Sequence, residues 1–168
     1  MSDTAGAIFS DDRRFRFLLW RNWAAGPLAH FCMLNPSKAD ENELDPTLRR
    51  CKGFAERWGM GGMVITNLFP LVATNPQDLI AAHDRNGPPR GMFHVNDDHI
   101  IAAANQAEIT VLGWGTNVQK KALAGHVPYV YHGLLKEHHP KALRVSKMGH
   151  PIHPLYLPYD CELKEWTR

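Results

Sequence analysis

The amino-acid sequence predicts an α/β protein with a mainly parallel central sheet. Buried strand patterns alternate along the chain with amphipathic helix patterns, which is the order that builds parallel sheets. Apolar residues make up 44% of the 168 residues and charged residues 21%, as is typical of a globular protein with its own core. We expect residues 1–12 to form a flexible tail and residues 13–168 to form a single domain.

The first two strands are predicted to form an N-terminal β-hairpin. The stretch RFRFLLWRNW (14–23) is aromatic-rich and partly alternating, which suits a strand. The turn AAGP follows, and LAHFCML (28–34) has the pattern of a second strand. We expect these two strands to pair with each other, and the second to end at Asn35.

Helix and strand signals then alternate through the middle of the chain. Asp45 and Pro46 mark the start of a helix that ends near Gly59. The buried strand MVITN precedes a helix that begins near TNPQDLIAAH. Asn96 is expected to cap a third helix, which is followed by the buried strand EITVLGWG.

The C-terminal third is predicted to contain a short helix and two more strands. TNVQKKALAG (116–125) suits the helix, and VPYVYH (127–132) and ALRVS (142–146) suit the strands. The remaining residues are proline-rich and predicted to be loop.

Four stretches leave strands of this predicted sheet at its carboxyl edge, where ligands of α/β proteins bind. They are Asn35-Pro36-Ser37, Asn67-Leu68-Phe69-Pro70, Trp114-Gly115-Thr116-Asn117, and the loop that holds His150 and His153.

Composition argues against several kinds of site. The formal net charge is +2, so a polyanion site must be a local patch. Cys32, Cys51 and Cys161 are widely spaced, which argues against disulfides and cysteine-held metals. His138 and His139 have no third ligand at a useful spacing, so we expect no metal and no cofactor. With no signal peptide and no long apolar run, we expect a cytoplasmic protein without a membrane partner.

Five motifs carry a resemblance that extends over nearly the whole chain. They are MLNPSKAD, DPTLRRC, WGMGGMVITNLFPL, HDRNGPP and GHPIHPLYLP. In this order they resemble a bacterial and phage domain-of-unknown-function family, number sixteen forty-three. That family name implies no chemistry.

Four shorter motifs resemble the uracil-DNA glycosylase superfamily. Those enzymes have a first loop of the type Gly-x-Asp-Pro or Gly-x-Asn-Pro, and MLNPS is similar, with Met33 in place of the glycine. VITNLF, LGWGTNVQKKA and HPIHPLYLP are similar to the later motifs. The resemblance implies a three-layer α/β/α sandwich, similar to uracil-DNA glycosylases, that hydrolyses an N-glycosidic bond.

The resemblance also implies catalytic roles. Asn35 would orient the attacking water through its amide oxygen, since an amide cannot take a proton. Either His153 or His150 would donate to the negative charge that develops on the leaving base. We favour His153, because it heads the uninterrupted stretch HPLYL.

The base-binding residues implied by the resemblance are Asn67, Phe69, Pro36 and Ser37. The Asn67 amide can read the polar edge of a pyrimidine, and Phe69 can stack on a flipped base.

A nucleic-acid surface is expected near the last loop. Residues 120–150 hold six Lys or Arg and one acid, and apolar residues that could wedge into a duplex follow His153. The expected set is Lys120, Lys121, Arg144, Lys147, Leu155, Tyr156 and Leu157, to which Arg49, Arg50 and Lys52 could add.

The resemblance to uracil-DNA glycosylases, together with the charge pattern, implies hydrolysis of the N-glycosidic bond of an unusual or modified pyrimidine, with DNA favoured over RNA as the partner. Two alternatives stay open: a non-catalytic nucleic-acid-binding or regulatory module, and a hydrolase of free modified nucleosides or nucleotides. Asp40, Glu41 or Asp45 could be a general base near Asn35, although a solvated loop and a helix N-cap explain them too. The oligomeric state is not indicated.

Overall fold

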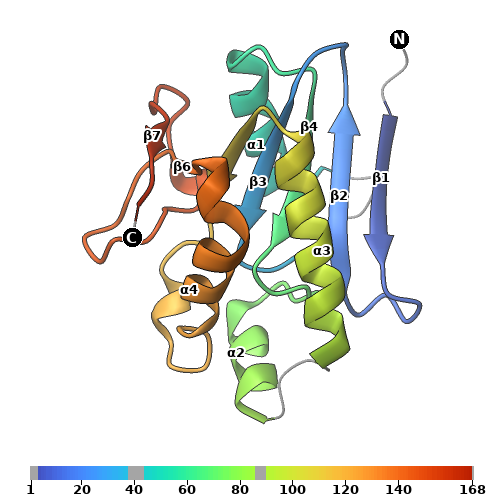
Figure 1. Ribbon diagram of the computed structural model, residues 1–168, viewed down its shortest axis with the longest axis vertical. Helices are drawn as coiled ribbons and strands as arrows, with labels where there is room; N and C mark the ends of the chain where they lie inside the picture. Colours follow the sequence, from blue (N-terminus) through green and yellow to red (C-terminus); the bar gives the residue numbers. More distant parts are fainter. Residues whose placement is uncertain (1–3, 38–43, 86–89, 168) are drawn as a thin grey trace.

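The computed structural model describes residues 4–37, 44–85 and 90–167, which form one seven-stranded sheet with four α-helices around it (Figure 1). The strands are β1 (Thr4–Phe9), β2 (Arg16–Asn22), β3 (Leu28–Met33), β4 (Gly62–Asn67), β5 (Ile109–Leu112), β6 (Lys141–Ala142) and β7 (Lys164–Glu165). The α-helices are α1 (Pro46–Arg57), α2 (Pro76–Arg85), α3 (Arg90–Gln106) and α4 (His126–Val130). No helix in these ranges has both the length and the apolar character that crossing a bilayer requires.

The sheet is mixed, with the strand order β1-β2-β4-β3-β5-β6-β7. Parallel pairing joins β3 to β4, β3 to β5 and β5 to β6. The pairs β1–β2, β2–β4 and β6–β7 are antiparallel. The prediction of a mainly parallel sheet is therefore wrong in its detail: the parallel strands occupy the middle, and antiparallel strands extend both edges.

The N-terminal hairpin consists of β1 and β2, and not of β2 and β3 as the sequence predicts. Strand β4 lies between β2 and β3 and pairs with both. Every residue of β4 is buried, as expected for a strand that has a neighbouring strand on each side. Residues 4–9, expected in a tail, form the edge strand β1, whose sequence TAGAIF has too little alternation to predict a strand.

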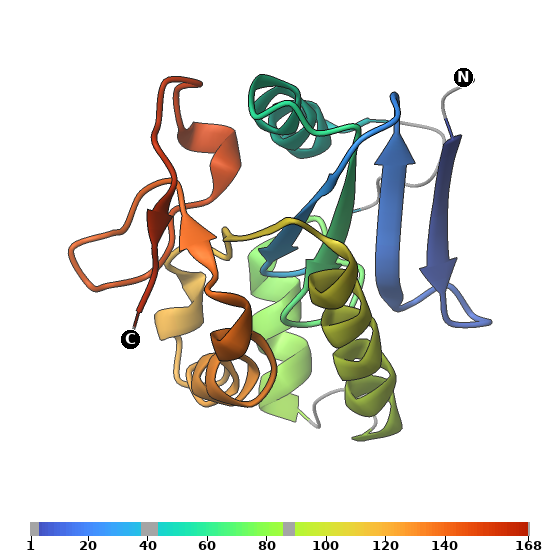
Figure 2. The same cartoon turned by 45° about the horizontal axis from the view of Figure 1, so that its top comes forward.

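Helices cover both faces of the sheet (Figure 2). Strand β3 shows the division, because its successive side chains point to opposite faces. Phe31 and Met33 pack with buried residues of α1 on one face. Cys32, with Leu34 just beyond the strand, packs with residues of α2, α3 and α4 on the other. Two apolar cores therefore fix β3 on both faces and set the direction in which the chain leaves it.

Two further predictions from the sequence differ from the structure. Residues 127–132, predicted as a strand, belong to α4 and to the following π-type turn η2 (Tyr131–Leu135). Val127, Val130 and Leu135 are buried near helical spacing, so tertiary packing overrides their strand preference. Asn96 lies inside α3 and does not cap it; its Nδ2 donates to the Asn67 carbonyl oxygen at 2.9 Å.

Candidate functional site

A cavity of about 380 Å³ lies at the carboxyl ends of β3 and β5. Residues 33–35, which end β3 and follow it, line one side, and residues 114–117, which follow β5, line another. The start of α1, the loop before α2 and the segment around His153 complete the lining. Three of the four strand-exit stretches singled out in the sequence therefore meet at this cavity.

The orientation of the Asn35 amide is fixed by its neighbours. Its Nδ2 donates to the carbonyl oxygens of Ala73 at 2.7 Å and of Pro36 at 3.1 Å. Both partners can only accept hydrogen bonds, so the nitrogen must face them. The side-chain oxygen Oδ1 is then the atom left to meet a ligand or a water, and it can only accept.

Asp45 combines two roles at the cavity. As the N-cap of α1 it accepts a hydrogen bond from the Leu48 backbone N–H to Oδ1 at 2.7 Å. Its Oδ2 accepts from the Ser37 hydroxyl at 2.6 Å. Ser37 and Asp45 both line the cavity. Each carboxylate oxygen keeps a second lone pair, so this N-cap can also accept a proton or a ligand hydrogen bond.

Arg16 brings a cation to the same cavity, and a β-bulge explains how. In the β1–β2 ladder Ile8 pairs with Leu18 and Phe9 with Arg16, so Phe17 has no partner across the ladder. Such an extra residue interrupts the alternation of side chains and re-aims them. Phe17 stacks on His99 of α3, whereas Arg16 lines the cavity on the α1 side.

The Arg16 side chain is 3% exposed, and burial lowers the pKa of its guanidinium to about 10, partly offset by Asp45. At neutral pH Arg16 is therefore charged and Asp45 supplies an opposite charge nearby. Among the lining residues that the structure describes, these two formal charges cancel, which favours a ligand that is neutral overall but rich in hydrogen-bonding groups.

His153 faces the cavity as a neutral donor. Its Nδ1 accepts from the Leu155 backbone N–H at 3.3 Å, which leaves the proton of the neutral ring on Nε2. Burial lowers the pKa of His153, and the Asp45 charge acts in the opposite direction. At neutral pH the ring thus has one N–H, on Nε2, to donate.

The two histidines left open by the sequence differ in position. His153 lines the cavity, and His150 is not among the lining residues. His150 is buried in a turn that two hydrogen bonds to Ser146 close. The His150 carbonyl oxygen accepts from the Ser146 backbone N–H, and the His150 backbone N–H donates to the Ser146 hydroxyl oxygen.

The other predicted base-binding residues are not brought to the cavity together. Asn67 is 1% exposed; it pairs with Met33, which lines the cavity, but Asn67 itself does not. Phe69 is buried in the core with α2, α3 and α4, against His83 and His126, and does not line the cavity. Pro36 is buried and is not among the lining residues, so a base bound in this cavity would meet Ser37 but not Pro36, Asn67 or Phe69.

The predicted nucleic-acid residues fall into three groups. Leu155 and Tyr156 line the cavity, and Tyr156 is 77% exposed at its edge. Leu157 is 2% exposed and packs in the core with α1, so its side chain is not available to a partner. The four basic side chains are exposed: Lys120 and Lys121 just after the lining residue Asn117, and Arg144 and Lys147 on the segment after β6.

Sequence reasoning missed Arg16 and undervalued Asp45. The sequence does carry one signal for Arg16, because a charged residue between Phe15 and Phe17 is unusual in a strand rich in aromatic residues. For Asp45 the helix-cap pattern was recognised, but the pattern does not reveal what else lies at the helix start. Asp40 and Glu41, the other acids considered, lie outside the described residues.

The assembled groups include both hydrogen-bond acceptors and hydrogen-bond donors. Asp45 and the Asn35 oxygen are acceptors suited to a water or a sugar hydroxyl, and His153 and Arg16 are donors. Trp114, buried to 1% exposure, gives the cavity an aromatic wall. Within the part of the chain that the structure describes, no group of three His, Cys, Asp or Glu side chains could hold a metal ion.

Comparison with known proteins identifies a family. A family model described as "Protein of unknown function (DUF1643)" matches residues 16–155. This span begins at Arg16 and contains every cavity-lining residue except Tyr156. No curated protein and no solved structure matches the chain. The chain belongs to the DUF1643 family of proteins of unknown function.

Proposed function

We propose that this protein binds a nucleobase with its sugar in the cavity and hydrolyses the N-glycosidic bond that joins them. The observation that carries the proposal is the meeting of a carboxylate, Asp45, an amide oxygen, of Asn35, and a neutral imidazole N–H, of His153, around one cavity of about 380 Å³. That volume lies within the range of small-molecule sites.

The proposed reaction assigns a separate task to each group. Asn35 Oδ1 and Asp45 hold a water, whose oxygen forms a bond to the sugar carbon C1′ as the bond from C1′ to the base breaks. The electron pair of the broken bond leaves with the base, and Asp45 takes the proton of the water. Asp45 thereby supplies the proton acceptor that Asn35 cannot be.

His153 stabilises the leaving base. A base that departs with the bonding electrons gathers negative charge on its ring oxygens, and a preset N–H donor lowers the energy of that state. Burial keeps His153 neutral and limits the water that would compete with the hydrogen bond. Arg16 adds a positive charge that offsets the Asp45 carboxylate before the reaction begins.

The fold and the surroundings are consistent with this proposal. Helices on both faces of the sheet resemble the three-layer arrangement of uracil-DNA glycosylases, and the motif order in the sequence points the same way. We further propose a modified pyrimidine in DNA as the substrate and the cytoplasm as the compartment, where the three free cysteines would stay reduced.

The test is a base-release assay with the purified full chain. Single strands and duplexes would each carry one uracil, one 5-substituted uracil or one ring-modified cytosine. Released base is measured by mass spectrometry and abasic sites by alkali cleavage. We expect release with the wild type, loss with Asp45→Asn, and no change with Asp98→Asn, an exposed acid on α3.

Two outcomes would replace the proposal with an alternative. Binding of strands without release of any base by the wild type would indicate a non-catalytic nucleic-acid-binding module. Release from free nucleosides, with none from strands, would indicate a nucleoside hydrolase. Equal release by the wild type and Asp45→Asn would remove Asp45 from the mechanism.

A further inference from the structure

Two guanidinium groups from α1 stack on the same aromatic ring outside the cavity. The Arg57 Cζ lies 3.9 Å from the centre of the Tyr159 ring, and the Arg50 Cζ lies 4.2 Å from it. The three side chains are called the arginine clamp below. Arg57 is exposed, and Arg50 and Tyr159 are partly exposed, so a partner from solvent can reach the clamp.

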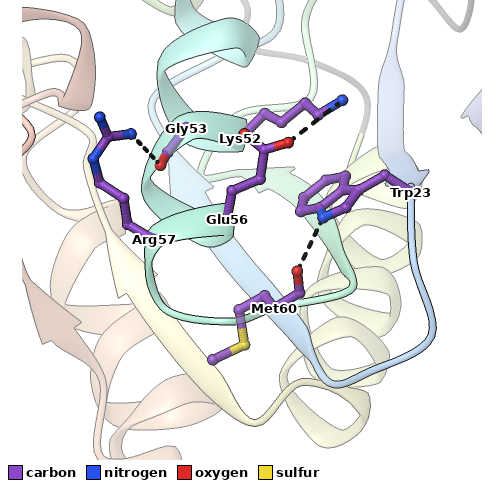
Figure 3. Close-up of polar contacts among 6 residues, drawn as sticks. All are labelled: Trp23, Lys52, Gly53, Glu56, Arg57 and Met60. Carbon is purple, nitrogen blue, oxygen red and sulfur yellow. Dashed lines mark hydrogen bonds and ion pairs between the residues drawn. The ribbon is translucent and has the colours of Figure 1, made fainter.

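The helix is adapted to hold this ring. Gly53 lies between the two arginines on α1, and a Cβ at that position would come 2.5 Å from the Tyr159 hydroxyl oxygen. Glycine weakens a helix interior, so its presence here needs a local reason. That reason is the close packing of the Tyr159 ring against the helix backbone at Gly53. Arg57 also donates from Nη1 to the Gly53 carbonyl oxygen at 3.0 Å, which limits the freedom of its guanidinium (Figure 3).

Neither arginine of the clamp has an acidic partner among the described residues. Glu56, the acid next to Arg57 in the sequence, pairs with Lys52 at 3.8 Å. Figure 3 marks this contact with a dashed line. Holding two positive charges on one ring is electrostatically unfavourable without an anion, although stacking on the ring offsets part of that cost. An anion that bonds to both guanidiniums would complete the arrangement.

The clamp lies next to the cavity along α1. Thr47 and Leu48, in the first turn of α1, line the cavity, and Arg50 follows within the next turn. At a rise of about 1.5 Å per residue, the helix carries Arg57 roughly 15 Å beyond Thr47. Tyr159 itself comes three residues after Tyr156, the exposed residue at the cavity edge, in a segment that packs on α1.

We propose that the arginine clamp binds the phosphodiester backbone of a nucleic-acid strand whose nucleotide occupies the cavity. Guanidinium groups bind phosphate oxygens through paired N–H donors, which suits two arginines that are held in place. The Arg16–Asp45 balance favours a neutral base and sugar inside, which leaves the phosphates for the clamp outside. The proposal rests on the proposed function only in placing a nucleotide of the strand in the cavity.

Fluorescence anisotropy with a labelled single strand and a labelled duplex tests the clamp. We expect Arg50→Gln/Arg57→Gln to weaken binding roughly tenfold or more near 0.1 M salt. The slope of log K against log salt should fall by about 0.7 for each lost contact on a single strand and about 0.9 on a duplex. Arg14→Gln/Lys164→Gln removes the same total charge from exposed positions outside residues 120–150 and should change neither quantity.

A charge-conserving variant separates recognition from folding. Arg50→Lys/Arg57→Lys keeps both charges but loses the paired donors, so binding should fall less than with glutamine and the salt slope should be kept. Thermal unfolding of each variant identifies any that is misfolded. Unchanged affinity and slope in folded Arg50→Gln/Arg57→Gln would overturn the clamp, as would a wild type that binds no strand.

The clamp and the proposed reaction fail in different ways. If the glutamine variant loses strand binding while the wild type releases no base, the clamp stands and the proposed hydrolysis fails. If the wild type releases base from strands and the glutamine variant binds and reacts equally well, the hydrolysis stands and the clamp fails.

Discussion

The Ser37 hydroxyl donates a hydrogen bond to Oδ2 of Asp45 at 2.6 Å, and this contact ties the exit of β3 to the start of α1. Hydrogen bonds to a carboxylate are short and strong, so Ser37 helps to hold the carboxylate in one orientation. The second oxygen of Asp45 is held by the Leu48 N–H at 2.7 Å. The helix cap is thereby a fixed part of the cavity wall.

Two substitutions at Asp45 separate its structural role from its chemical one. Asparagine caps helices about as well as aspartate, so Asp45→Asn should keep the helix cap and lose stability only through the missing charge near buried Arg16. The same variant should lower base release by about 10²- to 10⁴-fold, the range expected for a lost general base. Asp45→Ala loses the cap as well as the charge and should be about 1 kcal/mol less stable than Asp45→Asn. Urea unfolding and the base-release assay check both; equal stability of Asp45→Asn and Asp45→Ala would contradict the separation.

Replacing Asn35 with aspartate should not improve the site. The new carboxylate oxygen would face the carbonyl oxygens of Pro36 and Ala73, where Nδ2 now donates. We expect Asn35→Asp to lower the free energy of unfolding by roughly 1–3 kcal/mol at pH 7, and by more than Asn35→Ala. Denaturant unfolding measures this. Faster base release by Asn35→Asp with unchanged stability would show that the amide is oriented the other way.

The two histidines of the last loop should differ in their effect on base release. His153→Ala removes the donor at the cavity and should lower the rate by about 10²-fold. His150→Ala should lower stability, since His150 is buried, but change the rate per folded molecule less than tenfold. Single-turnover rates, corrected for the folded fraction by circular dichroism, decide between them; the reverse order of effects would assign the role to His150.

His126 should make stability depend on pH. Burial lowers its pKa from 6.5 to about 4, with the Leu68 carbonyl acting against that shift and His83 acting with it. Between these values the unfolded chain binds more protons, so this contribution is complete above pH 6.5 and is lost as the pH falls toward 4. The loss is about 1.4 kcal/mol per pH unit.

The comparison for this effect is a pair of glutamine variants. His126→Gln keeps an N–H for the Leu68 carbonyl and should reduce the pH slope of the unfolding free energy by one histidine. Burial lowers the pKa of His30 to about 3, so in His126→Gln this second histidine still makes the unfolding free energy fall as the pH falls. His132→Gln removes an exposed histidine and is the matched control. If the wild type, His126→Gln and His132→Gln all show the same pH slope of the unfolding free energy in urea titrations, the assignment of this pH dependence to His126 is contradicted.

Elements with a strong local pattern were predictable from the sequence. The cap and proline at Asp45 and Pro46 mark the start of α1 correctly, and the buried strand that contains Ile65 is found where its β-branched residues predict it. Strand pairing was not predictable, because it depends on which strand the core buries most completely. Strand β4 displaced the expected partner of β2 for that reason.

The candidate site divides in the same way. Asn35, Ser37 and His153 were recognised because each follows a strand or heads a short motif, and all three line the cavity. Arg16 was missed because a one-residue bulge turns it to the α1 side, and a bulge leaves almost no trace in a single sequence. Leu157 was assigned to a surface, whereas the core buries it.

The sequence by itself determined the α/β class, the family and three of the strand exits that line the cavity. These follow from local periodicity and short motifs, which act over a few residues. The tertiary structure alone decided which groups share a cavity, since Arg16, Asp45 and His153 are far apart in the chain and meet through sheet order and helix packing. It also decided that two arginines of α1 share one tyrosine ring, because that contact joins segments about a hundred residues apart.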